Sequence, residues 1–409
     1  MTVLPDDALP LSLRRSPPFI MFWTSRVLGS LAFQMSSVAF SWLIYDLTDS
    51  AYLLGLAGLA QFLPMVLLTF VVGSVADRFD RRRIVSLSQI VQGLTIAVLT
   101  VGTATGLMGV SAIFAGLVIL GAARTFERPA MAALLPGIVP LSVLPRAVAV
   151  SSSAMQTATI LGPSLGGLLF AFGAYVPLGL SALLFLFAAV SLVPLRLREK
   201  PRPAEPMSLS TAFLGLSFIR RRPILLGALS LDMVAVLLGG FTALLPIFAR
   251  DILHAGPWGL GLLRAAPAVG AVLMSVFIDR LDLERGVGTK LFASVVVFGL
   301  CTVIFAASTN LALSIAALIV LGAADNISVV IRQSLVQLST PDDMRGRVNA
   351  VNSLFIGASN QLGEFESGMT AGLFGVVEAG IIGGIGTITV AIAWMHLFPS
   401  LRKAERLAP

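Results

Sequence analysis

The chain has 409 residues, of which 56% are hydrophobic and 12% are charged, about half of the charged share of ~25% in soluble proteins. Its mean hydropathy of +0.93 leaves too little polar surface to cover a soluble fold of this size, so the apolar surface must face lipid. The net charge of +7 does not indicate nucleic-acid binding, because the arginines lie in short segments between apolar runs. The composition therefore predicts an integral membrane protein.

Several kinds of chemistry have no support in the sequence. The single cysteine, Cys301, rules out an internal disulfide and argues against a metal cluster, and no phosphate-binding loop or dinucleotide fingerprint is present. GPSLG fits the G-x-S-x-G pattern of hydrolases, but Ser164 falls inside a predicted membrane helix, without the strand and histidine which that pattern needs. We therefore expect no enzyme, metal or cofactor, and an ion gradient rather than ATP as the energy source.

Membrane-spanning helices are predicted along almost the whole chain. Residues 1–18 contain prolines and acids without a signal-peptide pattern, so we expect a tail that stays in place. A helix that crosses ~30 Å of hydrocarbon needs roughly 20 mostly apolar residues. Twelve runs meet this requirement, at residues 19–45, 52–76, 84–104, 108–128, 147–171, 174–194, 223–248, 258–278, 289–308, 311–333, 347–375 and 378–398. Residues 399–409 follow as a second tail.

The basic residues predict how the chain is oriented. Lys and Arg cluster in the loops after even-numbered runs and in the two tails, whereas the opposite loops hold only Arg250. Because cytoplasmic loops carry an excess of Lys and Arg, both termini are expected in the cytoplasm.

The predicted helices divide into two similar halves. The longest loop, residues 195–222, contains the Pro-rich stretch REKPRPAEPMS and is predicted to be a cytoplasmic linker. GAAR at Gly121 recurs as GAAD at Gly322, and DRFD recurs as DRLD, at a nearly constant spacing of about 200 residues. This duplication predicts two six-helix bundles, residues 19–194 and 223–398, facing each other across a cavity.

The duplicated pattern and one loop resemble the major facilitator superfamily. GSVADRFDRRRIV is similar to that superfamily's G-x-x-x-D-R-x-G-R-R/K motif between helices 2 and 3. The matching residues are Gly73, Asp77, Arg78, Arg81 and Arg82. Asp80 stands where the superfamily has its second glycine. The resemblance implies an all-α integral membrane fold of twelve transmembrane helices in two pseudo-symmetric six-helix bundles.

A second motif lies in the fifth predicted helix. GPSLGG is similar to the G-P-x-x-G-G signature of the superfamily's antiporters and exporters, with matching residues Gly162, Pro163, Gly166 and Gly167 and with Ala158 in place of the preceding glycine. Small residues let helices pack closely, and a proline removes one helical hydrogen bond, so ordinary packing is the alternative interpretation. Phrases such as GAARTFERPAMAALLPGIVP resemble the secretion-effector branch, which includes enterobactin and macrolide exporters.

The resemblance also implies a function. We expect a monomeric secondary active transporter in the bacterial plasma (inner) membrane. It would export amphipathic small molecules, such as drugs, siderophores or secondary metabolites, in exchange for protons by alternating access. A lipid or lysophospholipid transporter of the same fold remains an alternative. A membrane sensor would require a large soluble segment, which these residues do not include.

Charged residues inside the predicted helices are candidates for function, because a charge at the bilayer centre costs ~3 kcal/mol or more. Asp232 and Glu364 are the strongest candidates for proton coupling, since a poorly solvated carboxylate can bind and release a proton near neutral pH. Glu364 is favoured slightly, because Pro163 occupies the equivalent position in the first half. The alternative is a permanent ion pair of Asp232 or Glu364 with Arg26 or Arg264.

Further charges lie nearby. Glu366 is about 200° around the helix from Glu364, so we expect one of the two to face the cavity and the other to pack against a neighbouring helix. A second set lies toward the inner ends of helices 4 and 10 and consists of Arg124, Glu127, Asp325 and Arg332. Arg124 corresponds to the superfamily's helix-4 arginine, but TFERPA lacks the glycines of that motif, so an ion pair with Glu127 at an inner gate is an equal alternative.

The loop motif is predicted to act as a gate. The resemblance implies that Asp77 lies at the N-terminus of helix 11 near Arg347, where the helix dipole and positive charge stabilise it. Asp279 and Arg280 of DRLD would make the counterpart contact near Arg146, at the start of helix 5. Such contacts between the halves would favour the inward-closed state.

Overall fold

The structure, a computed structural model, describes residues 13, 16–140, 142–195, 209–281 and 285–406, and every regular element within them is helical. The long helices are α1 (Pro17–Thr48), α2 (Ala51–Arg78), α3 (Arg81–Ala104), α4 (Val110–Leu134), α5 (Leu144–Phe170), α6 (Tyr175–Ser191), α8 (Pro223–Leu238), α10 (Gly256–Phe277), α11 (Val287–Ala307), α12 (Leu311–Ser339), α13 (Asp342–Phe374) and α14 (Val376–Leu397). The shorter elements are α7 (Leu209–Arg220), α9 (Leu245–Ile247), α15 (Pro399–Arg402), the 3₁₀ segments η2 (Leu135–Gly137), η3 (Phe241–Leu244) and η5 (Ile278–Leu281), and the π-helical turn η4 (Phe248–Ile252).

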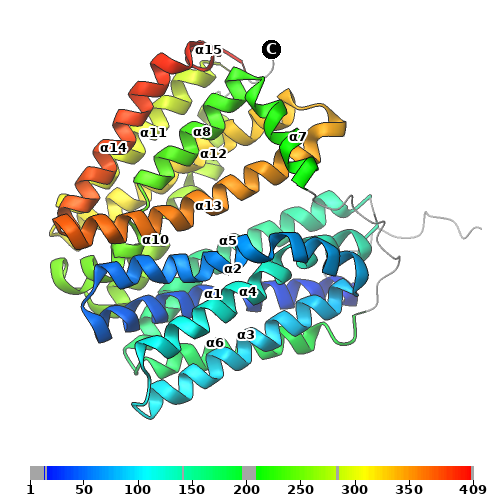
Figure 1. Cartoon of the computed structure of the whole chain (residues 1–409), viewed down its shortest axis with the longest axis vertical. Helices are drawn as coiled ribbons and strands as arrows, with labels where there is room; N and C mark the ends of the chain where they lie inside the picture. Colours follow the sequence, from blue (N-terminus) through cyan, green and yellow to red (C-terminus); the bar gives the residue numbers. More distant parts are fainter. Residues whose placement is uncertain (1–12, 14–15, 141, 196–208, 282–284, 407–409) are drawn as a thin grey trace, which may run out of the picture.

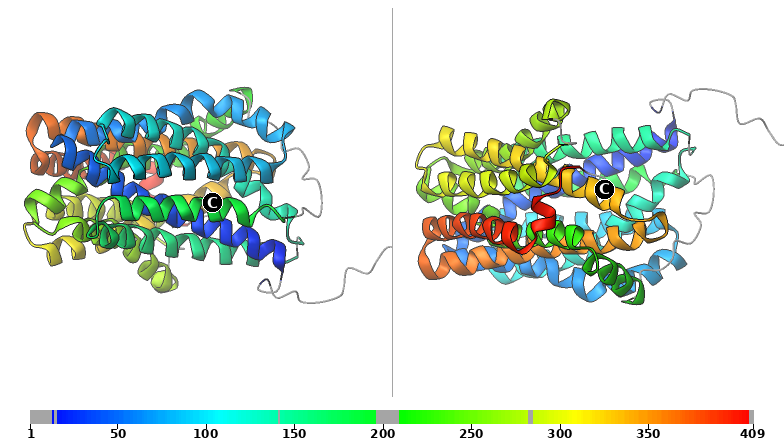
Figure 2. Two further views of the ribbon diagram at one scale, coloured as in Figure 1. Left: turned by 90° about the horizontal axis from the view of Figure 1, so that it is seen from below. Right: turned by 90° about the horizontal axis from the view of Figure 1, so that it is seen from above.

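The long helices form two groups. Helices α1–α6 pack against one another, as do α8 and α10–α14, and the two groups lie one below the other in Figure 1. Figure 2 shows the helices of both groups running roughly along one direction. The groups are joined mainly through two helix pairs, α2 with α13 and α5 with α10. The contacts of these four helices therefore determine the position of one group relative to the other.

Two ends of the molecule can be distinguished. The Asp49 end is the end at which Asp49 connects α1 to α2. The linker end is the opposite one, where α6 ends and α7 lies (Figure 1). Helix α7 occupies part of the predicted linker, and a Cβ added at its Gly215 would lie 2.8 Å from the carbonyl oxygen of Arg347 in α13. The second half of the linker is thus a helix packed on α13.

The outer surface of the helices is apolar. Val98 of α3, Phe187 of α6 and Ile385 of α14 are exposed, whereas Gln89 and Gln92 of α3 are buried. A water-soluble protein has the reverse distribution, because exposing apolar area to water is unfavourable. The surface is that of a multi-pass membrane protein with its backbone polar groups satisfied inside helices.

Within the described residues, nine helices are long and apolar enough to cross a membrane: Pro17–Thr48, Ala51–Leu68, Arg81–Ala104, Val110–Gly137, Pro223–Ile252, Gly256–Phe277, Val287–Ala307, Leu311–Ser339 and Val376–Leu397. Helix α6 is apolar but has only 17 residues. Helices α5 and α13 are rich in Gly, Ser, Thr and Gln, and each packs against a more apolar helix of the opposite group, α10 and α2 respectively. The nine spans thus include nine of the twelve predicted helices and leave out α5, α6 and α13.

The predicted run 223–248 is not one continuous helix. Helix α8 ends at Leu238 and is followed by Gly239 and Gly240, the 3₁₀ segment η3 and the π-helical turn η4. A Cβ added at Gly240 would lie 2.6 Å from the carbonyl carbon of Gly363 in α13, so the two backbones touch at the break. The break places Thr242 in η3, beside α13, and Arg250 further along the same segment in η4, which packs against α10.

Candidate functional site

A central cavity of about 260 Å³ lies where the two groups meet. Its polar and charged lining consists of Gln34, Ser37, Gln61, Thr242, Arg264, Gln361 and Glu364. Its apolar lining consists of Phe33, Pro163, Phe241, Leu245, Pro267 and Leu318. Both groups contribute to each kind of surface. A concave site with an apolar wall and a few convergent polar groups suits a small amphipathic ligand.

The two charged residues of the cavity come from different helices of the second group. Arg264 of α10 donates hydrogen bonds from its terminal nitrogens to Ser37 Oγ (2.8 Å) and Ser41 Oγ (3.0 Å) of α1. Glu364 of α13 accepts a hydrogen bond from Thr242 Oγ1 (3.4 Å). Arg264 and Glu364 interact electrostatically, but they form no ion pair within 4.0 Å. Arg264 therefore links the two groups through hydroxyls.

Glu366 and Arg26 do not line this cavity. The Glu366 carboxylate accepts a hydrogen bond from Thr370 Oγ1 of its own helix (2.7 Å). Glu364 is thus the member of the acidic pair that faces the cavity. The guanidinium of Arg26 lies 5.9 Å from the centre of the Phe22 ring in the same helix.

The small residues of α5 make close contacts beside the cavity. A Cβ added at Gly167 would lie 2.3 Å from the carbonyl oxygen of Pro257 in α10, and one at Gly162 would lie 2.5 Å from Gln34 Cβ in α1. Gly166 approaches the backbone of α1 in the same way. Pro163, next to Gly162, lines the cavity itself. The GPSLGG stretch thus brings α5 against helices of both groups.

Asp232 lies away from the cavity, inside the second group. It forms an ion pair with Arg332 of α12, and both side chains are nearly buried. The sequence suggested Arg26 or Arg264 as its partner, and the structure corrects this: α8 and α12 are neighbours, whereas Arg264 reaches across to α1. Asp325, also on α12, interacts electrostatically with Asp232 and Arg332.

The first group contains a polar cluster of its own. Glu127 of α4 accepts hydrogen bonds from Gln89 Nε2 (2.9 Å) and Gln92 Nε2 (2.7 Å) of α3, and Ser25 of α1 donates to Gln89 (3.0 Å). The guanidinium of Arg124 lies 3.1 Å from the centre of the Phe33 ring. The sequence suggested an ion pair between Arg124 and Glu127, but the described contacts are a cation–π contact for the arginine and amide hydrogen bonds for the glutamate.

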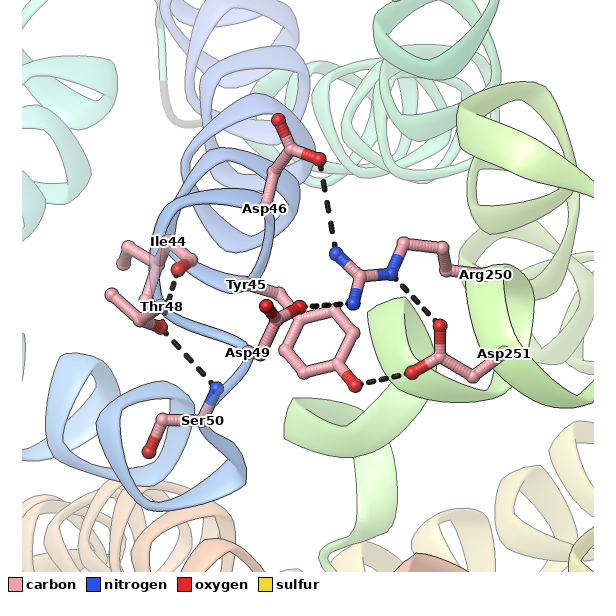
Figure 3. Close-up of polar contacts among 8 residues, drawn as sticks. All are labelled: Ile44, Tyr45, Asp46, Thr48, Asp49, Ser50, Arg250 and Asp251. Atoms are coloured by element: carbon pink, nitrogen blue, oxygen red, sulfur yellow. Dashed lines mark hydrogen bonds and ion pairs between the residues drawn. The ribbon is translucent and has the colours of Figure 1, made fainter.

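An ion cluster at the Asp49 end also joins the two groups (Figure 3). We call Tyr45, Asp46, Asp49, Arg250 and Asp251 the Arg250 cluster. The Arg250 guanidinium pairs with Asp49, with Asp46 (3.8 Å) and with Asp251 (2.8 Å), and it lies 4.1 Å from the centre of the Tyr45 ring. The Tyr45 hydroxyl donates a hydrogen bond to Asp251. The cluster therefore ties the end of α1 to the η4 turn.

The backbone of Asp49 makes this arrangement possible. Asp49 ends α1 with φ of 49°, in the left-handed region that Asp tolerates better than most residues. Its N–H donates to the carbonyl oxygen of Tyr45 (2.8 Å). The Asp49 carboxylate is thereby turned toward Arg250.

The residues of the predicted gate are described in part. Gly73 lies in α2, but the side chains of Asp77, Arg78 and Asp279 lie outside the described ones. Arg81 and Arg82 donate to backbone oxygens of their own group, to Ala133 (3.3 Å) and to Leu195 (2.7 Å). Arg146 and Arg280 are exposed, with Arg280 over the Phe277 ring at 5.0 Å, while Arg347 contacts Met344 Sδ (3.7 Å). The contact of Asp77 with helix 11 remains a prediction.

Sequence reasoning missed the residues that depend on contacts across helices. Thr242, Ser37 and Ser41 carry no charge, and nothing in their spacing marks them. The Arg250 cluster did have a signal, because Arg250 is the only basic residue in its set of loops and three acids lie close to the same predicted helix ends. A lone cation among acids at helix ends indicates ion pairing.

The helical fold, the apolar surface and a cavity between two joined groups define a membrane transporter. The profile of the family described as transmembrane secretion effector matches residues 9–408. The chain belongs to this family of the major facilitator superfamily, and it is a transporter, not an enzyme. The resemblance drawn from the sequence is thereby confirmed.

Similar proteins agree with this assignment. The enterobactin exporter EntS of Citrobacter koseri is 24% identical over 405 residues, covering 97% of this chain and 95% of that protein. The multidrug efflux pump Tap of Mycobacterium tuberculosis is 25% identical over 412 residues, covering 97% and 96%. The uncharacterized transporter YfiS of Bacillus subtilis is 30% identical over 350 residues, covering 80% and 81%.

Solved structures share the fold at low sequence identity. The nucleoside transporter NupG superposes with a TM-score of 0.69 at 14% identity, covering 93% of this chain and 99% of that one. A bacterial homolog of the human lysosomal transporter Spinster, in an inward-facing and unoccupied conformation, gives 0.70 at 13% identity, covering 96% of each chain.

Proposed function

We propose that the protein is a proton-coupled exporter of amphipathic small molecules, working as a monomer by alternating access. The observation that carries this proposal is the mixed polar and apolar cavity between the two groups. Both groups line it, so a movement of one group against the other changes which side of the membrane the cavity faces. The proposal includes twelve membrane-spanning helices in two pseudo-symmetric six-helix bundles, with α5, α6 and α13 crossing the membrane beside the nine most apolar spans.

The orientation and the state of the transporter are part of the proposal. The linker end carries the arginine-rich loops, so we assign it to the cytoplasm of a bacterial inner membrane, with both termini there. The Asp49 end then faces outward, where the Arg250 cluster and the glycine contacts of α5 and α13 hold the groups together. We therefore assign this arrangement to an inward-facing state, the state named for the Spinster homolog.

Two carboxylates are our candidates for carrying the proton. Asp325 and Glu364 form no ion pair within the described part of the chain, whereas Asp232 is paired with Arg332. Asp325 shares that one guanidinium with Asp232 electrostatically. A single cation cannot neutralise two carboxylates in a poorly solvated interior, so a proton is the simplest compensating charge. Glu364 offers a second proton site in the cavity itself.

The direction of transport rests on the relatives. EntS is named as an exporter and Tap as an efflux pump, and both are aligned over almost the whole chain. Export of a small amphipathic molecule is therefore favoured over lipid transport. The energy source would be the proton gradient, with no resident cofactor.

The test uses inside-out membrane vesicles that contain the protein, with a panel of fluorescent amphipathic dyes. Energised vesicles should accumulate at least one dye more than vesicles without the protein, and nigericin, which collapses the pH gradient, should abolish the difference. Asp325→Asn or Glu364→Gln should remove the response to the gradient. If nigericin has no effect on accumulation and both variants behave like the wild type, proton coupling is rejected.

A further inference from the structure

The most unusual charge in the cavity is the guanidinium of Arg264. Its two terminal nitrogens donate to the hydroxyls of Ser37 and Ser41, and its buried Nε has no hydrogen-bond partner. No carboxylate of the described residues lies within 4.0 Å of it. Burying an arginine without an ion pair is unfavourable, and the hydroxyls satisfy hydrogen bonds without cancelling the charge. The site therefore holds a cation that lacks a close counter-ion.

Glu364 is not a permanent counter-ion for Arg264. Its carboxylate is engaged by Thr242, and it packs against α2 so closely that a Cβ added at Gly58 would lie 2.8 Å from Glu364 Oε2. A carboxylate can also lose its charge by taking up a proton, whereas a guanidinium stays protonated in proteins. The permanent charge on the cavity wall is thus positive.

A second guanidinium adds to the positive field. Arg124 lies 3.1 Å from the centre of the Phe33 ring, Phe33 lines the cavity, and the Arg124 Nε is likewise buried without a partner. A cavity walled by low-dielectric material focuses such fields and concentrates ions of the opposite sign. Arg124 does not line the cavity itself, and Glu127, one turn further along α4, offsets part of its charge. Arg264, the fixed cation of the cavity wall, therefore carries the preference for an anionic ligand over a cationic one.

We propose that Arg264 binds an acidic group of the ligand, such as a carboxylate, while Phe33, Phe241, Leu245 and Leu318 receive its apolar body. A carboxylate can displace the two serine hydroxyls and form paired, charge-assisted hydrogen bonds to the planar guanidinium, which are stronger than bonds to neutral hydroxyls. The ligand class is therefore the amphipathic organic anion. This inference rests on the proposed transport function and narrows its substrates, and the same chemistry would also suit the headgroup of an anionic lipid.

The test measures equilibrium binding and requires no transport. The purified protein in nanodiscs of zwitterionic lipid is titrated with dansylglycine, a fluorescent carboxylate, and with dansylglycinamide, its neutral counterpart. The wild type should bind the carboxylate at least tenfold more tightly than the amide. Arg264→Gln should reduce this preference to about onefold while still binding the amide, and Arg264→Lys should retain part of it. Arg285→Gln, which removes an exposed arginine far from the cavity, serves as the control for net charge.

Two results would overturn the anion site: equal binding of the two probes by the wild type, or a carboxylate preference that survives in Arg264→Gln. Lack of saturable binding of either probe by folded protein would count against it as well. Because binding is measured without a gradient, these results can occur while the vesicles still show proton-driven export of other dyes, so the two proposals fail separately. Repeating the titration with phosphatidylglycerol in the nanodiscs identifies the source of the anion: competition indicates a lipid headgroup, and unchanged binding indicates a soluble acid.

Discussion

Arg332 of α12 forms a buried ion pair with Asp232 of α8, while Asp325, about two turns earlier on α12, interacts with both residues without an ion pair of its own in the described chain. Around Arg332, the described residues therefore place two acids beside one base. The two acids are not equivalent, because only Asp232 holds the base directly.

Because only Asp232 pairs directly with Arg332, we expect removal of the charge of Asp232 and removal of the charge of Asp325 to have opposite effects on stability. Asp232→Asn leaves Arg332 buried without its counter-ion, and breaking a buried pair costs roughly 3–5 kcal/mol, so this variant should melt well below the wild type. Asp325→Asn removes the uncompensated charge and should melt at or above the wild-type temperature. The measurement is the thermal unfolding temperature of the wild type, Asp232→Asn and Asp325→Asn in the same detergent. The double variant Asp232→Asn/Arg332→Gln should recover most of the loss, and an equally strong destabilisation by Asp325→Asn would contradict the assignment.

The Arg250 cluster predicts a shift between transport states. Two ion pairs of Arg250, with Asp46 and Asp49, cross between the groups. Exposed ion pairs contribute roughly 0.2–1 kcal/mol each, so Arg250→Gln should change the ratio of outward-facing to inward-facing molecules by about two- to thirtyfold. Spin labels in a Cys301→Ser background report this ratio. The distance between labels at Leu107→Cys and Leu373→Cys, at the Asp49 end, should lengthen, and that between Val193→Cys and Leu338→Cys, at the linker end, should shorten. Arg285→Gln should change neither, and a variant Arg250→Gln with unchanged distances would show that the cluster does not hold this end closed.

The glycine contact between α2 and α13 predicts a steric effect. A Cβ added at Gly368 would lie 2.6 Å from Gly55 Cα, whereas one at Gly372 would have its nearest neighbour, Tyr52 Cβ, at 3.8 Å. Gly368→Ala should therefore prevent full closure of the Asp49 end and lower dye export severalfold, while Gly372→Ala should behave like the wild type. The same spin-label pair at the Asp49 end checks the first effect. Equal behaviour of the two variants would mean that the helices adjust without cost.

The loop motif predicts a shift in the direction opposite to that of Arg250→Gln. If Asp77 stabilises closure of the linker end, Asp77→Asn should raise the inward-open population. The measurement is the rate at which a membrane-impermeant maleimide, applied from the cytoplasmic side, labels Gln361→Cys in the cavity. Labelling should be faster in Asp77→Asn than in its parent. An unchanged rate would remove Asp77 from the gate.

The fold class was predictable from the sequence because a helix in lipid must be apolar along its whole length, which leaves a clear pattern in the sequence. Apolar runs and arginine placement depend on residues that are close in the chain, and the duplicated phrases can be recognised by comparing one half of the chain with the other. The apolar signal is weaker at α5 and α13, which are rich in small and polar residues, although their partners α10 and α2 make the same contacts between the groups and remain apolar. The break after α8 was also missed, since Gly239 and Gly240 are compatible with an apolar run and only the approach of Gly363 reveals their role.

The charged residues of the candidate site could be predicted from the sequence, but the residues with which they interact could not. Glu364 and Arg264 stand out in any apolar helix because their burial is costly. Which acid meets which base depends on the rotation and depth of helices that lie far apart in sequence, so Arg332 could not be assigned to Asp232 in advance. Neutral partners such as Thr242 leave no mark in the sequence at all.

The break after α8 connects the cavity to the Arg250 cluster through one short segment of backbone. Thr242, which holds Glu364 in the cavity, and Arg250, which holds the Asp49 end, lie about two helical turns apart on one short segment that is separated from α8 by two glycines. A ligand that displaces Glu364 from Thr242 thus acts on the same piece of backbone that carries the outer ion cluster. If the segment moves as one unit, reporters at Thr242 and at Arg250 should respond to a ligand with the same rate constant.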